Sequence, residues 1–95
     1  MRVYWSNNAI DHLDGIQRFI GLSSESHALK MIDHITRRSE QIGSFPESGR
    51  VVPEIGEPRI REVLEGPYRF VYHITSTRIE ILAVLHGAQN FIWNP

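Results

Sequence analysis

Residues 68–86, YRFVYHITSTRIEILAVLH, contain the pattern that decides the fold, two strand-like runs on either side of a short break. Aromatic and β-branched residues dominate both runs, which is typical of β-strands, and the break falls at Ser76-Thr77. A connection of this length joins neighbouring strands in antiparallel order. Another run precedes them across Glu65-Gly66-Pro67. We therefore predict a three-stranded antiparallel meander over residues 59–64, 68–75 and 78–86.

Two helices are predicted before this meander. Ser6-Asn7-Asn8 offers N-cap oxygens for the first helix, and Gly21 is a natural C′ residue at its end. Apolar residues recur every three or four positions and form one stripe: Ile10, Leu13, Ile16, Phe19 and Ile20. Ser23-Ser24-Glu25 starts a second helix that Gly43 closes, with its own stripe at Ala28, Met31, Ile32, Ile35 and Ile42. The short link indicates an antiparallel helical hairpin.

A short strand over Arg2–Ser6 is expected ahead of the helices. The stretch Gly43–Pro58 holds three prolines and three glycines, so we expect an irregular segment that Val51 and Val52 anchor. The order of elements is then β-α-α-β-β-β, an α+β fold with both helices on one face of the sheet. We expect a single domain over residues 1–95.

Composition and charge exclude several classes of function. The formal net charge of −1 argues against a protein that binds polyanions through its bulk field. The absence of cysteine excludes disulfides and thiolate metal sites, and we expect neither a metal nor a cofactor. The sequence has no apolar run of about 18 residues and no signal-peptide core, so a cytoplasmic location is expected. Nine of the ten cationic residues are arginine, which suits bidentate contacts to phosphate or carboxylate.

Strand pairing predicts which side chains share a face of the sheet. A two-residue turn at Ser76-Thr77 would pair His73 with Glu80, Val71 with Leu82 and Arg69 with Val84. The opposite face is then strongly apolar and should pack on the helices: Tyr68, Phe70, Tyr72, Ile79, Ile81, Ala83 and Leu85.

The pairing of the first hairpin depends on the length of the turn at residues 65–67. A three-residue turn pairs Leu64 with Tyr68 and keeps Ile60 and Leu64 inside, with Glu62 facing inward near a strand end. A two-residue turn would instead place Glu62 on the outer face, because a slip of one residue reverses every side chain. We favour the three-residue turn.

The outer face expected from this pairing is both basic and apolar. Its charged members are Arg59, Arg61, Arg69, His73 and His86, with Val63, Val71, Leu82 and Val84 between them. Such a mixture suggests a covered interface. The cations could bind phosphate and His86 could act as a general acid or base, or Arg69 and His73 could pair with Glu62, Glu80 or an acidic partner. A binding surface is favoured over a nuclease, and the histidines of the helices, at 12, 27 and 34, are interpreted as solvated.

Five segments, in order and nearly at the family's spacing, resemble the RelE/ParE toxin superfamily. They are Trp5-Ser6 at a helix start, residues 45–50 (FPESGR), residues 60–62 (IRE), residues 66–72 (GPYRFVY) and residues 81–89 (ILAVLHGAQ). The resemblance covers roughly residues 3–90. It implies a toxin of a type II toxin–antitoxin system, with two helices against an antiparallel sheet.

The superfamily has two activities, and the resemblance distinguishes them. RelE-type members cleave messenger RNA on the ribosome, and Arg59, Arg61 and Arg69 match their basic strand pair and Tyr-Arg arginine. Gly87-Ala88-Gln89 stands where such members carry a further arginine, and Trp93 lies near the position of their late tyrosine, leaving His86 to transfer the proton. ParE-type members share the His-Gly-Ala ending and poison DNA gyrase without known chemistry of their own.

The resemblance therefore favours a ParE-like, plasmid-stabilisation type of toxin that inhibits growth by binding DNA gyrase, and it leans against an enzyme. The alternatives are a ribosome-dependent mRNA interferase that uses Arg61, Arg69 and His86, or an inert relative that only binds antitoxin. The implied partner is an antitoxin whose C-terminal segment wraps the toxin with acidic groups facing the arginines. The expected antitoxin-binding residues are Arg61, Arg69, Leu82 and Val84.

Overall fold

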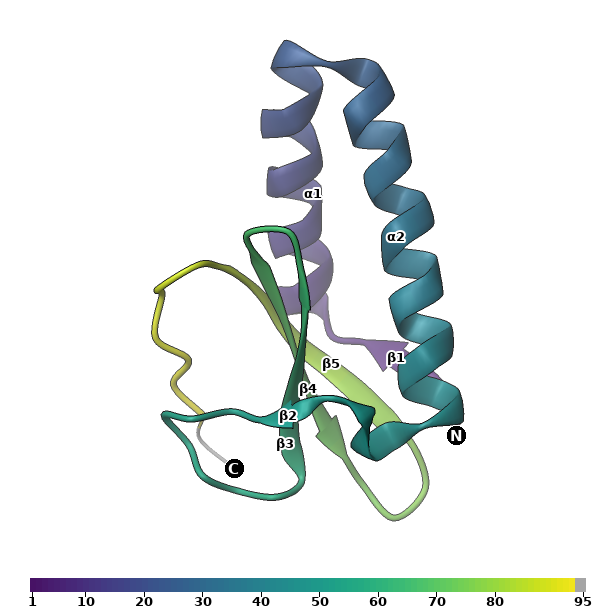
Figure 1. Ribbon diagram of the computed structural model, residues 1–95, viewed down its shortest axis with the longest axis vertical. Helices are drawn as coiled ribbons and strands as arrows, with labels where there is room; N and C mark the ends of the chain where they lie inside the picture. Colours follow the sequence, from purple (N-terminus) through teal and green to yellow (C-terminus); the bar gives the residue numbers. More distant parts are fainter. Residues whose placement is uncertain (94–95) are drawn as a thin grey trace.

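The computed structural model of the protein describes residues 1–93 and has the predicted α+β arrangement (Figure 1). Two helices, α1 (Asn7–Ser23) and α2 (Glu25–Ser44), form an antiparallel hairpin. A 3₁₀ turn, η1 (Pro46–Ser48), follows them. The strands are β1 (Val3–Trp5), β2 (Arg50–Val51), β3 (Ile60–Glu65), β4 (Tyr68–Ile74) and β5 (Ile79–His86).

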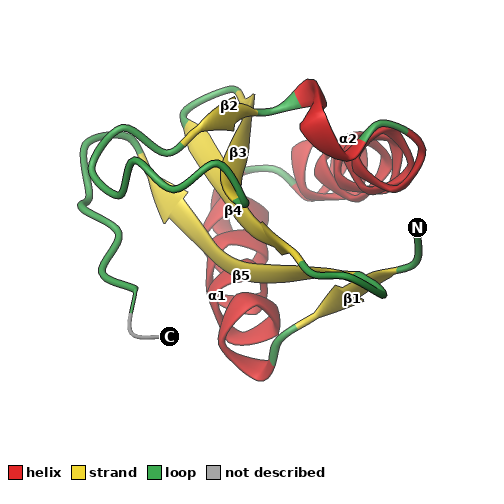
Figure 2. Ribbon diagram, turned by 90° about the horizontal axis from the view of Figure 1, so that it is seen from below, coloured by secondary structure: helices red, strands yellow, loops and turns green. Residues whose placement is uncertain are grey.

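The sheet contains five strands in the order β1-β5-β4-β3-β2. The meander of β3, β4 and β5 is antiparallel as predicted, whereas β1 runs parallel to β5. Strand β2 was not predicted and adds a two-residue edge against β3. Both helices cover one face, here called the helix face, and the segments after β2 and β5 cross the other, the outer face (Figure 2).

Each helix begins at a serine cap, and the chain passes from one to the other through a single residue. Ser6 Oγ accepts a hydrogen bond from the Ala9 N–H at 3.0 Å. Ser24 ends α1, and its backbone N–H donates to the Ile20 carbonyl. The same residue caps α2, because its Oγ accepts a hydrogen bond from the His27 N–H. The prediction that Gly21 is the C′ residue is therefore wrong: Gly21 lies inside α1, which continues to Ser23 and ends at the Ser24 cap.

The apolar stripes of the helices are narrower than predicted. The side chains that pack on the sheet are Ala9, Leu13, Ile16 and Ile20 from α1, and Met31, Ile35 and Ile42 from α2. The predicted core residues Ile10, Phe19 and Ile32 are exposed. Phe19 lies in the last turns of α1, where the hairpin extends beyond the end of the sheet in Figure 1 and no sheet surface can bury it.

The turn between β3 and β4 contains two residues, Gly66 and Pro67, and the predicted three-residue turn is wrong. Glu65 pairs with Tyr68, and Gly66 adopts a φ of +56°, the conformation at the first central position of a type II′ turn. The register therefore differs by one residue from the favoured one. Ile60, Glu62 and Leu64 share the outer face with Arg69, while Arg61 and Val63 have the opposite parity.

A β-bulge in β5 changes the second hairpin. His73 pairs with Glu80 as predicted, but Tyr72 pairs with Ile81 and Val71 with Ala83, so Leu82 is an extra residue. The parity of β5 reverses after Leu82. Four predicted placements are therefore wrong. Ala83 and Leu85, predicted to face the helices, lie on the outer face, and Val84 and His86, predicted on the outer face, lie on the helix face.

The start of α1 supplies hydrogen-bond partners to the bulge. Strand β1 stops pairing with β5 at Ile81, one residue before the bulge. Beyond that point Ser6 Oγ donates to the Leu82 carbonyl at 3.2 Å, and the Val84 N–H donates to His12 Nδ1 at 3.2 Å. Backbone groups of β5 beyond its last pair with β1 thus find partners at the start of α1, as buried backbone groups require.

The sheet separates two hydrophobic cores. The larger lies under the helices and includes Phe70, Tyr72, Ile79, Ile81 and Val84. The smaller lies on the outer face, where Val52, Ile60, Val71 and Ala83 are buried beneath Ile55, Phe91 and Trp93. Val52 anchors the irregular segment as predicted. The outer face, which was expected to form a covered interface, is covered by segments of the chain itself. Neither helix of residues 1–93 has the length and apolar character needed to cross a membrane.

Hydrogen bonds to the hydroxyl of one tyrosine fix the position of residues 45–49 against the sheet. Tyr72 Oη donates to the Pro46 carbonyl at 2.5 Å and accepts from the Gly49 N–H at 3.1 Å. Gly49 is buried against this hydroxyl, and a Cβ atom there would lie 2.5 Å from Tyr72 Oη and 2.6 Å from the Glu62 carbonyl oxygen. Burial raises the pKa of Tyr72, so the hydroxyl keeps its proton for this contact.

We expect Gly49→Ala to destabilise the protein by about 1–3 kcal/mol, because the added methyl group must displace buried backbone or break the tyrosine contact. Gly15→Ala is the matched control: nothing lies within 4 Å of its Cβ position in α1. Alanine there should stabilise the helix by about 0.5–1 kcal/mol. Urea unfolding followed by circular dichroism measures both. Equal unfolding midpoints for the two variants would contradict the close packing at Gly49.

Candidate functional site

Arg69 occupies the centre of the outer face and is engaged by two carboxylates. Its side chain is only 10% exposed, with Nη2 2.6 Å from Glu62 Oε1 and 2.7 Å from Glu54 Oε1. Its Nη1 also donates to the Gln89 carbonyl at 2.7 Å. The interpretation that Arg69 pairs with Glu62 is therefore confirmed, and the register that placed Glu62 inward is wrong.

These contacts extend into a network that closes the outer face. Glu62 is fully buried and also binds the more exposed Arg50 at 2.6 Å. Glu54 accepts the N–H of Phe91 at 3.0 Å. The network thereby ties the segment after β2 and the segment after β5 to the middle of the sheet. We call Arg50, Glu54, Glu62 and Arg69 the outer-face ion network.

The electrostatics of the network keep it charged. Hydrogen bonds from the Arg69 guanidinium lower the pKa of Glu54 to about 2, and the bond to Glu54 raises the pKa of Arg69. A phosphate that approached Arg69 would have to displace two carboxylates already in bidentate and bifurcated contact with it. Arg69 is thus a cation whose charge is compensated inside the protein.

The other two predicted site arginines are bound to backbone carbonyls. Arg61 Nη1 donates to Gly49 O at 2.9 Å, and its Nε donates to Pro58 O at 2.9 Å. Arg59 Nη1 donates to Ile74 O at 3.3 Å. Arg61 therefore does not join Arg69 on the outer face as predicted, because the two-residue turn gives it the opposite parity.

The two predicted site histidines lie on opposite faces of the sheet. His73 stays on the outer face, where its ring meets Trp93 edge to face at 5.4 Å. His86 lies on the helix face, with its ring edge to face with Tyr68 at 5.5 Å. The bulge separates them, so the five predicted site residues do not form one cluster.

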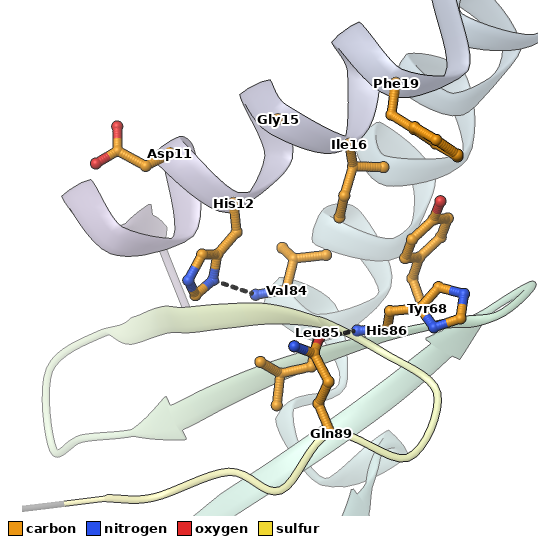
Figure 3. A pocket seen from close by; sticks show the side chains of 10 residues that line it. All are labelled: Asp11, His12, Gly15, Ile16, Phe19, Tyr68, Val84, Leu85, His86 and Gln89. Carbon is orange, nitrogen blue, oxygen red and sulfur yellow. Dashed lines mark hydrogen bonds between the residues drawn. The ribbon is translucent and has the colours of Figure 1, made fainter. Parts of the chain in front are cut away.

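A hollow of about 500 Å³ opens between α1 and the end of β5, and His86 lines it (Figure 3). Phe19 and Ile16 from α1 and Tyr68 from β4 form its apolar wall, and Gln89 lies beside His86 (Figure 3). The backbone N–H of His86 donates to Gln89 Oε1 at 2.8 Å.

His12 also lines this hollow, and the prediction that it is a solvated side chain is wrong. Its Nδ1 accepts the Val84 N–H, as the dashed line in Figure 3 shows. The neutral ring therefore carries its proton on Nε2. The sequence offered no signal for this role, because His12 falls among polar helix positions and its partner is a backbone group of β5, 72 residues away in the chain.

A second hollow of about 300 Å³ lies between α2 and the turn after β3. His27, Lys30, His34 and Glu65 line it together with Met31 and Tyr68. Tyr68 therefore lines both hollows. Within residues 1–93 no group of three or more His, Asp or Glu side chains could hold a metal ion.

We expect Arg69→Met to lower the free energy of unfolding by about 3 kcal/mol, because it leaves buried Glu62 with only the exposed Arg50 as partner. Arg18→Met is the control, since Arg18 pairs with Asp14 in an exposed i,i+4 bridge on α1. Its effect should stay below about 0.5 kcal/mol. Chemical denaturation at neutral pH measures both, and a small effect at Arg69 would show that the network does not hold the fold.

The lowered pKa of Glu54 predicts how stability changes in acid. A carboxyl with a depressed folded pKa contributes stability above its unfolded value, here 4.5, and loses it as the pH falls toward about 2. Wild type should therefore exceed Glu54→Gln in stability most at neutral pH, and the difference should shrink between about pH 4.5 and about pH 2. Unfolding midpoints across this range test it, with Glu40→Gln on exposed α2 as control. A difference independent of pH would contradict the role of Glu54.

Comparison with known proteins identifies the family. Residues 3–91 match the family described as the ParE toxin of the type II toxin–antitoxin system, parDE. A solved structure described as the chromosomal ParDE TA system from P. aeruginosa is similar in fold, with a TM-score of 0.73 and 23% sequence identity over 92% of this chain and 96% of that chain. No curated protein matches the chain. Because the family match spans nearly the whole sequence, this chain belongs to the ParE toxin family of type II toxin–antitoxin systems.

Proposed function

We propose that this ParE-family toxin inhibits growth by binding DNA gyrase, without cleaving RNA, and that a cognate antitoxin neutralises it. The observation that carries the proposal is the state of the three arginines that a nuclease of this fold would use. Arg69 is compensated by Glu54 and Glu62, and Arg59 and Arg61 are bound to carbonyl oxygens. The engagement of these arginines therefore favours a function in binding a protein partner over RNA cleavage.

Cleavage of a phosphodiester requires a proton donor or acceptor close to the cations that stabilise the transition state. His86 is the residue that the resemblance left for this proton transfer, and it lies on the helix face. Arg69 lies on the outer face, inside the ion network. A general base and a charge stabiliser on opposite sides of a sheet do not form one catalytic centre, which argues against the mRNA interferase.

Exposed apolar side chains of the helices that cover the helix face favour antitoxin binding on that side of the molecule. Of the four residues expected to contact the antitoxin, Arg69 and Val84 are buried and Arg61 is bound to backbone. By contrast, Phe19, Leu22 and Leu29 on the helical hairpin are exposed by 72%, 87% and 62%. An amphipathic helix that covers such side chains gains from burial of apolar area. We therefore propose the helix face as the main antitoxin surface.

Induced expression of the toxin alone is expected to arrest growth, and the purified protein should inhibit DNA supercoiling by gyrase. Co-expression of the protein encoded by the adjacent gene, as the candidate antitoxin, should restore both growth and supercoiling. His86→Gln serves as the matched variant, because it removes the proton-transfer group from an exposed position.

Under the gyrase proposal His86→Gln remains toxic and still inhibits supercoiling. Ribosome-dependent mRNA cleavage by wild type that is lost in His86→Gln would support the interferase instead. A folded protein that neither arrests growth nor inhibits gyrase would indicate an inert relative that binds antitoxin. Arg69 variants are unsuitable for this test, because loss of the ion network would lower activity by destabilising the fold.

A further inference from the structure

Four of the five histidines of the chain gather on the helix face. His12 and His86 line the hollow between α1 and β5, as Figure 3 shows, and His27 and His34 line the hollow beside α2. Because Tyr68 lines both hollows, we treat them as one surface and call it the histidine groove. The fifth histidine, His73, lies on the outer face against Trp93.

The permanent charges that face the histidine groove nearly cancel. On the α1 side the charged residue is Asp11, beside His12, Tyr68 and His86. On the α2 side Lys30 and Glu65 face His27, His34 and Tyr68. Glu65 already contacts Arg38 Nε at 3.2 Å and His34 Nδ1 at 3.4 Å. The net charge of the groove therefore depends on whether His27, His34 and His86 carry a proton, since His12 uses Nδ1 to accept the Val84 N–H.

The groove also presents donors beside apolar side chains. His12 uses Nδ1 as an acceptor for the Val84 N–H, so Nε2 is the donor of the neutral ring. Gln89 Oε1 accepts a hydrogen bond from the backbone N–H of His86, which leaves the side-chain amide nitrogen of Gln89 free to donate. Apolar side chains from both helices, Ile16, Phe19 and Met31, also line the groove. Donors beside such side chains match a segment that combines carboxylates with large apolar side chains.

We propose that the histidine groove binds an acidic, amphipathic segment of the antitoxin, and that this binding strengthens as the pH falls through the range in which imidazole gains a proton. The inference rests on the proposed function, which supplies the antitoxin. Carboxylates placed against imidazoles favour the protonated rings, so the complex takes up protons as it forms. The gain in affinity is complete where the rings are protonated and the carboxylates are still ionised, and it is lost as the pH rises above the imidazole range.

The test measures binding of the full-length toxin to the protein encoded by the adjacent gene. Isothermal titration calorimetry at about pH 7.5 and about pH 6 should show a Kd about tenfold lower at the acidic value, as expected for several partly exposed charge pairs. Titrations in two buffers that differ in ionisation enthalpy should show net proton uptake. The triple variant His27→Gln, His34→Gln, His86→Gln should lose most of both effects, because it lacks the rings that would take up the protons.

His73→Gln is the matched control and should keep the full pH dependence, because His73 lies outside the groove. The triple variant retains His12, whose bond to Val84 supports the fold, and circular dichroism checks that the variant is folded. Binding with the same pH dependence in wild type and in the folded triple variant overturns this inference alone, since the antitoxin's own groups would then account for the change. Absence of binding at either pH overturns the antitoxin proposal together with it.

Discussion

One extra residue in β5, Leu82, determines which side chains in the second half of that strand face each core. Before it, Ile79 and Ile81 pack under the helices, and after it Val84 takes that face. The bulge interrupts the regular ladder just beyond the last pair with β1, and backbone groups there would be costly if they were left without partners. Ser6 and His12 at the start of α1 provide those partners. The bulge and the helix therefore stabilise each other, and the position of His86 follows from both.

On the opposite face, the structure depends on charges that compensate one another. Glu62 would be an isolated buried carboxylate without Arg69, and Arg69 would be an isolated buried cation without Glu62 and Glu54. The cost of burying ions makes such a pair a poor source of net stability but a strong constraint on geometry. Here the constraint holds two irregular segments over the sheet. A basic residue on a strand can thus serve the fold and leave no charge for a ligand.

The two faces consequently differ in what they can do. The outer face is closed by the chain's own segments and by the ion network, so a partner finds few free groups there. The helix face is hollowed, and its hairpin extends past the sheet with apolar side chains exposed (Figures 1 and 3). Recognition by a protein partner is better suited to this second face, because it offers apolar area to bury and donors to satisfy.

The sequence alone determined the helices, the three long strands, their order and the α+β class, because these depend on apolar periodicity and turn residues within short windows. It also determined the family, since five segments kept their order and spacing. Tertiary structure decided the parity of β3, the bulge at Leu82 and hence the faces of Arg61, Val84 and His86. These depend on one-residue shifts, which reverse a strand's side chains without changing its composition. The partners of Arg69 and His12 are distant in sequence, and only the folded chain brings them together.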